Sequence, residues 1–328
     1  MDRDDKTRRK TRVAALSVAS NSLLVVFKLA VGILIGSVAV ISEAIHSGMD
    51  LVAAVIAFFA VRASGRKADE RHPYGHGKFE NISGVVEALL IFGAAAWIIY
   101  EAVHNLIEPQ EVQMPAWGAA VMLVSVLMNV VVSRRLFKVG KETDSVALQA
   151  DAWHLRTDVY TSVGVMVALL VVTVGAAVAP DTNLNWVDPV AAIAVAVLIL
   201  KAAYDLTRDS ARDLLDVSLP EEDVSWIAEF VAKQWPVVRS IHNLQTRKAG
   251  PYRFMDLHLV VADDMSVGDA HALGDEIVEA IKSRIPETRV LIHVEPCDYR
   301  CGEACASGCL VPADEREAGR AARKDLRR

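Results

Sequence analysis

Six long apolar runs constrain the fold of this chain more than any other feature. Each run has about 20 residues with few charges, which is the length that a helix needs to cross a bilayer. The runs cover residues 13–35, 38–61, 80–104, 115–133, 146–173 and 186–206. The composition agrees, because 53% hydrophobic residues and a mean hydropathy of +0.29 are high for a soluble chain of 328 residues. The sequence therefore predicts a multi-pass α-helical membrane protein with six transmembrane helices.

The positions of Lys and Arg predict how these helices are oriented. Six of these residues precede the first run, five lie between the second and third, and four lie between the fourth and fifth. The other three connections contain none, so the positive-inside rule predicts that both termini face the cytoplasm. We expect the membrane to be a bacterial inner membrane. A signal peptide is the alternative for the N-terminus, but no small-residue cleavage site follows a short apolar core. The net charge of −6 argues against a nucleic-acid partner.

The composition changes after about Thr207, which predicts a second, soluble domain. Apolar periodicity predicts helices at 220–235 and 267–284, and alternation predicts strands at 240–250, 252–262 and 289–295. This α-β-β-α-β order is typical of a small sheet with helices on one face. The predicted organisation is a basic segment at 1–12, a membrane domain at 13–207, a cytoplasmic α+β domain at 208–296 and a tail at 297–328. The end of the tail, 312–328, is charged and either loose or helical.

Two buried-looking His and Asp pairs are the strongest functional signal. His46 and Asp50 in the second run, and His154 and Asp158 in the fifth, each have i, i+4 spacing and so share a helix face. An ionised side chain at a helix centre costs about 2.5–3.5 kcal/mol on insertion scales, so it needs compensation. Each pair could be a local hydrogen bond inside its helix. Two identical pairs instead favour convergence into two imidazoles and two carboxylates, a tetrahedral set that suits Zn²⁺.

Four segments carry a family resemblance. They read "GSVAVISEAIHSGMDLVA", "HPYGHGKFE", "ADAWHLRTDVYTS" and "IHVEP". The chain resembles the cation diffusion facilitator family of divalent-metal/proton antiporters over about residues 10–296. The resemblance implies a homodimer in the lipid bilayer, with six spans per subunit and a ferredoxin-like, metallochaperone-like cytoplasmic domain. It also implies that the chain is a transporter and not an enzyme.

The resemblance assigns roles to further residues. It implies that His46, Asp50, His154 and Asp158 form the transport site, and their residue types resemble those of zinc-preferring members. It implies a second zinc site in a loop and a third in the cytoplasmic domain, where Glu295 stands near a position that is often Asp. The matched residues are Asp69, His72 and His76 for the loop, and His242, His258, His271, His293 and Glu295 for the domain. It also implies a charge interlock between Lys78 and Asp216 in the dimer. Without the resemblance, the loop is a solvated polar segment and the interlock is two unrelated surface charges.

The four cysteines lie outside what the resemblance covers. Cys297, Cys301, Cys305 and Cys309 follow one another at a constant spacing of four residues. On a helix this spacing aligns the thiols, but Gly302 and Gly308 weaken a helix, so a loop wrapped around a metal is equally compatible. A reducing cytoplasm favours binding of a thiophilic ion such as Zn²⁺ or Cd²⁺ over structural disulfides. The alternative is a tail of thiols without function.

The predicted activity is efflux of Zn²⁺ from the cytoplasm in exchange for protons. Efflux of Cd²⁺, Co²⁺ or Fe²⁺ by the same mechanism is the alternative, since raw affinity does not exclude these ions. A membrane metal sensor would keep the soluble histidines and the cysteines, but would have little need for the buried quartet. A membrane metalloprotease is disfavoured because the HExxH motif is absent.

Overall fold

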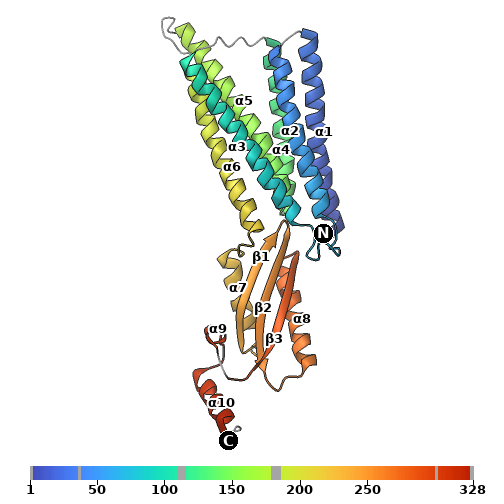
Figure 1. The fold of residues 1–328 in the computed structure, drawn as a ribbon, viewed down its shortest axis with the longest axis vertical. Helices are drawn as coiled ribbons and strands as arrows, with labels where there is room; N and C mark the ends of the chain where they lie inside the picture. The colour runs from blue at the N-terminus through green and yellow to red at the C-terminus, as the bar shows by residue number, and fades with distance from the viewer. Residues whose placement is uncertain (1–2, 36–37, 109–115, 179–185, 300–301, 326–328) are drawn as a thin grey trace. The chain divides into compact units, whose positions relative to one another are not determined.

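The computed structural model describes residues 3–35, 38–108, 116–178, 186–299 and 302–325, and Figure 1 shows their path. The chain divides into two compact units, Met1–Leu214 and Leu215–Arg328. The division falls at the end of a helix that continues eight residues beyond the predicted span, from 206 to Leu214. This extension is charged, so only the part before it has the composition of a membrane span.

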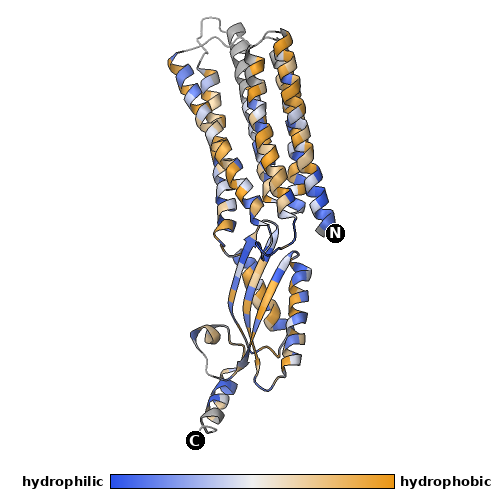
Figure 2. Cartoon of the chain, turned by 45° about the vertical axis from the view of Figure 1, so that its right-hand side comes forward, coloured by the Kyte–Doolittle hydropathy of each residue, from blue (hydrophilic) through white to orange (hydrophobic). Residues whose placement is uncertain are grey.

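The first unit is built from six long helices. Figure 2 shows that apolar residues dominate most of their length, whereas the start of the first helix is hydrophilic. Their bounds are α1 Arg3–Ile35, α2 Val38–Ser64, α3 Lys78–Ile107, α4 Ala116–Glu142, α5 Val146–Val178 and α6 Val187–Leu214. Within the described residues, α1, α2, α3, α4 and α6 contain segments long and apolar enough to cross a membrane. Much of the second half of α5 has side chains outside the described set, so the count of six spans stays a prediction.

Helix α5 packs in two hydrophobic cores at once. Leu148 and Leu155 of α5 join a core with Val61 of α2 and Leu136 of α4. Ala150, on another face of α5, joins a second core formed with α3 and α6. Small residues allow close approach in this second core: a Cβ on Gly84 of α3 would collide with the Ser210 hydroxyl of α6. Helix α5 therefore lies between an α1–α2–α4 group and an α3–α6 group.

A buried polar network joins the helices near their charged ends. The fully buried carboxylate of Glu80 on α3 accepts a hydrogen bond from Lys10 Nζ of α1 at 2.7 Å. It also accepts one from Ser64 Oγ of α2 at 2.7 Å, and another from the hydroxyl of Ser145, just before α5. Four segments of the chain thus converge on one side chain. A buried charge is retained where it is paired and hydrogen-bonded in this way.

The second unit has the predicted α-β-β-α-β order, followed by two short helices. Its elements are α7 Glu221–Gln234, β1 Ser240–Ala249, β2 Tyr252–Ala262, α8 Val267–Arg284, β3 Thr288–Cys297, α9 Glu303–Ser307 and α10 Ala313–Asp325. The strand order is β1-β2-β3, with β1 antiparallel and β3 parallel to β2. Both α7 and α8 cover one face of the sheet, where Ile227 and Ile277 pack against Met255 and Leu259 (Figure 1). The opposite face carries no such helix within the described residues.

Candidate metal centres

The membrane unit holds a cluster of ligand side chains between α2 and α5. His154 Nε2 lies 3.2 Å from Asp50 Oδ1, and His46 Nε2 lies 4.0 Å from Asp158 Oδ1. The close pairs therefore cross from one helix to the other, instead of linking residues four apart in one helix. Ligand atoms of His46, Asp50 and Asp158 all lie within 4.8 Å of one another. Two imidazoles and two carboxylates that converge in an apolar bundle form a set that suits a divalent cation.

A cavity of about 150 Å³ opens beside this cluster. His46, Asp50 and Asp158 line it together with the hydroxyl of Ser47 and the buried Lys28 of α1. Lys28 Nζ donates a hydrogen bond to Ser47 Oγ at 2.8 Å. The sequence analysis assigned no role to Lys28. The available signal was a lysine near the middle of an apolar run, where a positive charge is costly unless it serves a polar cavity.

Two further carboxylates lie buried in the same bundle. Glu87 of α3 and Asp151 of α5 are both 0% exposed. Glu87 Oε1 accepts a hydrogen bond from Ser83 Oγ at 2.9 Å, whereas Glu87 Oε2 has no hydrogen-bond partner among the described residues. Asp151 is one helical turn before His154, so it extends the polar side of α5 toward α3. The sequence analysis predicted no function for either residue, although an acid in an apolar run signals one.

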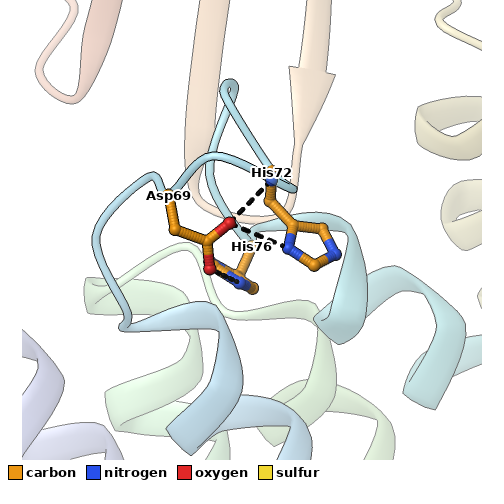
Figure 3. A group of neighbouring side chains, drawn as sticks. All are labelled: Asp69, His72 and His76. Carbon is orange, nitrogen blue, oxygen red and sulfur yellow. Dashed lines mark hydrogen bonds and ion pairs between the residues drawn. The ribbon is translucent and has the colours of Figure 1, made fainter.

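The loop between α2 and α3 folds around a carboxylate. Figure 3 shows His72 and His76 near the carboxylate of Asp69, with His76 Nε2 at 3.3 Å from Asp69 Oδ2. Asp69 Oδ1 accepts a hydrogen bond from the His72 backbone N–H at 2.7 Å and lies 3.2 Å from His72 Nδ1. Gly75, with φ of 90°, makes the turn that returns the chain to His76. These three residues share one small volume, as a metal site requires.

The electrostatics of this loop favour an ionised carboxylate. The backbone hydrogen bond from His72 is the main cause that lowers the pKa of Asp69, and the neighbouring imidazoles of His72 and His76 lower it further. His76 is 5% exposed, and its Nδ1 has no hydrogen-bond partner in the described part of the chain. The loop is thus a preformed set of one carboxylate and two imidazoles, in which ligation of His76 would offset its burial.

Strand register aligns three histidines across the open face of the sheet. His242 pairs with His258 in β1–β2, and His258 pairs with His293 in β2–β3. The ring centroids of His242 and His258 lie 5.1 Å apart, and those of His258 and His293 lie 4.8 Å apart. Glu295 lies two residues beyond His293, on the same face, with Oε1 at 2.8 Å from His258 Nδ1 and Oε2 at 3.4 Å from His242 Nε2. His242, His258 and Glu295 form the tight ligand set, and His293 stands beside it, 3.7 Å from Glu295.

Other predicted site residues lie elsewhere in the single chain. His271 is on α8, which covers the opposite face of the sheet, and its ring lies 3.5 Å from Asp275. The structure does not bring it to the other histidines. Lys78 Nζ donates to the Leu214 carbonyl at 3.3 Å, and Asp216 pairs with Arg247 at 3.4 Å, each inside its own unit. The interlock between Lys78 and Asp216 remains a prediction.

The cysteines are divided between a strand, a short helix and a loop. Cys297 ends β3 and is buried, while Cys305 lies in α9 and Cys309 follows it. Cys301 lies outside the described residues. Among the described cysteines, none belongs to a set of three ligands within 4.8 Å of one another. The continuous helix of aligned thiols does not form, because Gly302 and Gly308 flank a helix of only five residues.

The chain combines a helical membrane bundle, which holds an internal cluster of ligand side chains, with an α/β domain that carries a row of histidines. Together these features define a multi-pass membrane transporter of metal cations. Comparisons with known proteins agree. The family model of the cation efflux transmembrane domain matches residues 14–215, which is more than half of the chain, and that of the cation efflux protein cytoplasmic domain matches residues 219–297. The chain belongs to the cation efflux family, as the sequence analysis predicted, and members of this family are transporters.

Individual relatives extend over most of the chain. An uncharacterized transporter of Synechocystis sp. is 36% identical over 87% of this chain and 90% of its own length. The cation-efflux pump FieF of Cronobacter sakazakii is 32% identical over 89% of this chain and 95% of its own length. A solved structure of CzrB in its zinc form is 39% identical and covers 26% of this chain and 99% of its own, with a TM-score of 0.25. The predicted fold class, a helical membrane domain with a C-terminal α/β cytoplasmic domain, is confirmed.

Proposed function

We propose that this chain exports Zn²⁺ from the cytoplasm in exchange for protons, with His46, Asp50, His154 and Asp158 as the transport site. The observation that carries the proposal is the crosswise pairing of His154 with Asp50 at 3.2 Å and of His46 with Asp158 at 4.0 Å, beside a polar cavity. Nitrogen and oxygen ligands in this ratio suit a tetrahedral Zn²⁺ ion. The same ligands accept Cd²⁺, Co²⁺ and Fe²⁺, so ion preference is part of the test.

Proton exchange follows from the chemistry of the ligands. Metal binding requires neutral imidazole and ionised carboxylate, so Zn²⁺ displaces protons when it binds. Protons from the outer side compete with Zn²⁺ for the same nitrogen atoms, because a protonated imidazole nitrogen cannot coordinate a metal. Zn²⁺ binding would replace the hydrogen bond between His154 and Asp50 and the ion pair between His46 and Asp158 with metal–ligand bonds. Because two buried carboxylates are neutralised by the dication, loading changes the cost of moving these helices through the membrane.

The assembly we propose is a homodimer with both termini in the cytoplasm. The loop set Asp69, His72 and His76 and the sheet set His242, His258 and Glu295 then face the cytoplasm as metal-binding sites. Support comes from the match to the cytoplasmic-domain family model and from the distances within each set. In these sites Zn²⁺ would order the loop and the open face of the sheet as the cytoplasmic concentration rises.

The test is Zn²⁺ uptake into proteoliposomes under a proton gradient. The intact protein should accumulate Zn²⁺, and a protonophore should abolish the accumulation. Asp158→Ala should reduce the rate by about 10- to 100-fold or more, as loss of a ligand does. Glu101→Ala is the matched control, because it removes an exposed carboxylate from α3. Competition with Cd²⁺, Co²⁺, Fe²⁺ and Mn²⁺ ranks the ions.

Each outcome has a meaning. Zn²⁺ flux that depends on Asp158 and on the proton gradient supports the antiporter. Flux that prefers another ion overturns the assignment of Zn²⁺ alone. An absence of flux for every ion, in vesicles that contain folded dimer, overturns transport and favours a membrane metal sensor.

A further inference from the structure

The open face of the sheet continues into a cavity of about 250 Å³ beyond the row of histidines. The side chains of its lining that can ligate a metal include His242, Glu295, Cys297 and Cys305, and the carboxylate of Asp298 lines it as well. Two of these are thiols: Cys297 ends β3, and Cys305 lies in α9. The cavity is therefore chemically different from the His and Glu set alone.

Strand alternation explains why Cys297 faces this cavity. His293, Glu295 and Cys297 are alternate residues of β3, so their side chains leave the same face of the sheet. In the register, Glu295 lies opposite Val260 and Cys297 lies opposite Ala262 of β2. Cys297 therefore continues the row of His293 and Glu295 side chains along this face of β3, and it is 9% exposed.

The tail brings Cys305 back to the other side of the cavity by pairing with β1. Strand β1 is an edge of the sheet, so its outer N–H and C=O groups are available to another segment. Ile241 N–H donates to the Gly308 carbonyl at 3.2 Å, and Leu310 N–H donates to the Arg239 carbonyl at 2.8 Å. Ser240 Oγ donates to the Cys305 carbonyl at 3.1 Å. These bonds hold α9 over the start of β1, beside His242.

Side chains further along the tail fix the same arrangement. Arg239 Nη1 forms an ion pair with Glu315 of α10 at 2.6 Å and donates to the Tyr299 hydroxyl at 3.3 Å. Arg320 Nε donates to the Tyr299 carbonyl at 3.3 Å. These contacts hold the chain to the domain both before and after Cys305.

His242, in the wall of the cavity, has a buried ring nitrogen without a hydrogen-bond partner among the described residues. This nitrogen is Nδ1, and the side chain is 7% exposed. Its Nε2 faces Glu295 at 3.4 Å. A buried polar atom without a partner is costly, and a ligand in the cavity would offset that cost.

We propose that this cavity binds a thiophilic divalent cation, Zn²⁺ or Cd²⁺, through His242, Glu295, Cys297 and Cys305. One imidazole, one carboxylate and two thiolates give a four-ligand set, and thiolates select Zn²⁺ and Cd²⁺ over oxygen-preferring ions. The thiols lie on the wall of the cavity and not within the tight set of His242, His258 and Glu295, so binding draws α9 inward. Metal binding would thereby hold the tail against the edge of the sheet. This site does not depend on whether the membrane unit moves metal.

The test is Co²⁺ binding to the full-length protein in detergent, followed by thiolate-to-cobalt charge-transfer absorption in the near ultraviolet. The intact protein should show this absorption, and Cys297→Ser and Cys305→Ser should each remove most of it and weaken Cd²⁺ binding about tenfold or more. Cys309→Ser is the matched control: this thiol is in the same tail but does not line the cavity, so the absorption should persist. Absorption that survives both cavity variants, or that Cys309→Ser removes, would overturn the proposal.

A second measurement on the unaltered protein guards against misfolded variants. Zn²⁺ should slow alkylation of Cys305 by iodoacetamide at least about fivefold, read by mass spectrometry, and should leave Cys309 unchanged. Equal protection of both thiols, or protection of neither, contradicts the site. Neither readout uses transport, so a failure here is distinct from a failure of Zn²⁺ efflux.

Discussion

Asp50 and His154 are 104 residues apart in the chain, yet their side chains meet at 3.2 Å inside the helix bundle. Each has its sequence partner four residues away on its own helix, but the contact that forms is with the other helix. The reason is geometric, because i, i+4 residues stack along one face and leave their polar ends free to point at a neighbour. The residue pattern thus supplies ligands, and the packing of α2 on α5 decides which ligands pair.

Lys28 is expected to weaken metal binding, because it lines the cavity beside the proposed transport site. Its ammonium group is buried beside Ser47, in the cavity lined by His46, Asp50 and Asp158, and a positive charge disfavours a bound dication. Lys28→Met should raise the affinity for Zn²⁺ about tenfold, which corresponds to about 1.4 kcal/mol. Isothermal titration in detergent measures this, with Lys201→Met, an exposed lysine of α6, as the control. A lower affinity in Lys28→Met would show instead that Lys28 orients the site through Ser47.

The loop set should lose Zn²⁺ on acidification through its imidazoles and not through Asp69. The pKa of Asp69 lies below its unfolded value, chiefly because the His72 backbone N–H binds the carboxylate. The ionised carboxylate of Asp69 therefore stabilises the folded loop at pH values above its pKa in the unfolded chain. This stabilisation is lost only as the pH falls through the lower pKa of Asp69 in the folded loop. Asp69 stays ionised between about pH 5 and 7.5, so in this range protons displace Zn²⁺ by binding to the imidazole nitrogens and not to Asp69.

The matching experiment titrates Zn²⁺ into the Asp158→Ala protein at several pH values. Asp69→Asn should weaken binding to the loop about 10- to 100-fold and raise the pH midpoint of Zn²⁺ release, because protons displace a weakly held ion at higher pH. Glu70→Gln, at the adjacent exposed acid, should change neither quantity. Release of Zn²⁺ from the unaltered loop only below about pH 4, where carboxylates are protonated, would contradict the assignment of that release to the histidines.

At the scale of elements, Glu80 adds a buried polar link between helices that also share apolar cores. It ties α1, α2 and α3 to the residue that precedes α5. Helix α5, which carries two of the proposed transport ligands, also shares a core with each helix group. Small shifts between these groups would therefore change the distances between α2 and α5 ligands. In the proposed transport mechanism, metal loading would therefore act on helix packing.

Loss of the Glu80 charge should destabilise the bundle strongly. Glu80→Gln leaves the Lys10 ammonium, 4% exposed, without a counterion, which costs about 3–5 kcal/mol for a buried pair. Thermal unfolding in detergent should show the loss as a lower midpoint, and Lys10→Met combined with Glu80→Gln should recover at least about half of it. Arg9→Ala is the control, because the Arg9–Glu142 pair is 41% and 39% exposed and contributes less than about 1 kcal/mol. Equal effects of Glu80→Gln and Arg9→Ala would refute this role.

At the scale of the whole molecule, the predicted interlock of Lys78 with Asp216 is a statement about the dimer. Lys78→Asp should weaken dimerisation about tenfold, and Lys78→Asp combined with Asp216→Lys should restore it. Analytical ultracentrifugation at low and high salt checks both, since screening reduces the effect. Within one subunit Asp216 pairs with Arg247, so an Asp216→Lys protein that is unstable by itself calls for Arg247→Asp as the compensating partner. Restoration by Arg247→Asp but not by Lys78→Asp would reject the interlock.

Much of this protein was determined by its sequence alone. Apolar run lengths and charge placement predicted a helical membrane protein, and period-two alternation predicted the three strands, because these patterns are local. The same alternation puts His293, Glu295 and Cys297 on one face of β3. Spacing also predicted His46, Asp50, His154 and Asp158 as candidate ligands, and the family resemblance predicted the residues of the loop set.

Only the tertiary structure decided which of these residues meet. Strand register placed His242 beside His258 and His293, and α8 carried His271 to the opposite side of the sheet. Helix packing brought Lys28 to the cavity lined by His46, Asp50 and Asp158. Pairing of the tail with β1 brought Cys305 to the cavity lined by His242 and Cys297. Periodicity fixes the direction of a side chain relative to its own helix or strand. It does not fix which face of another segment, a hundred residues away, will pack against it.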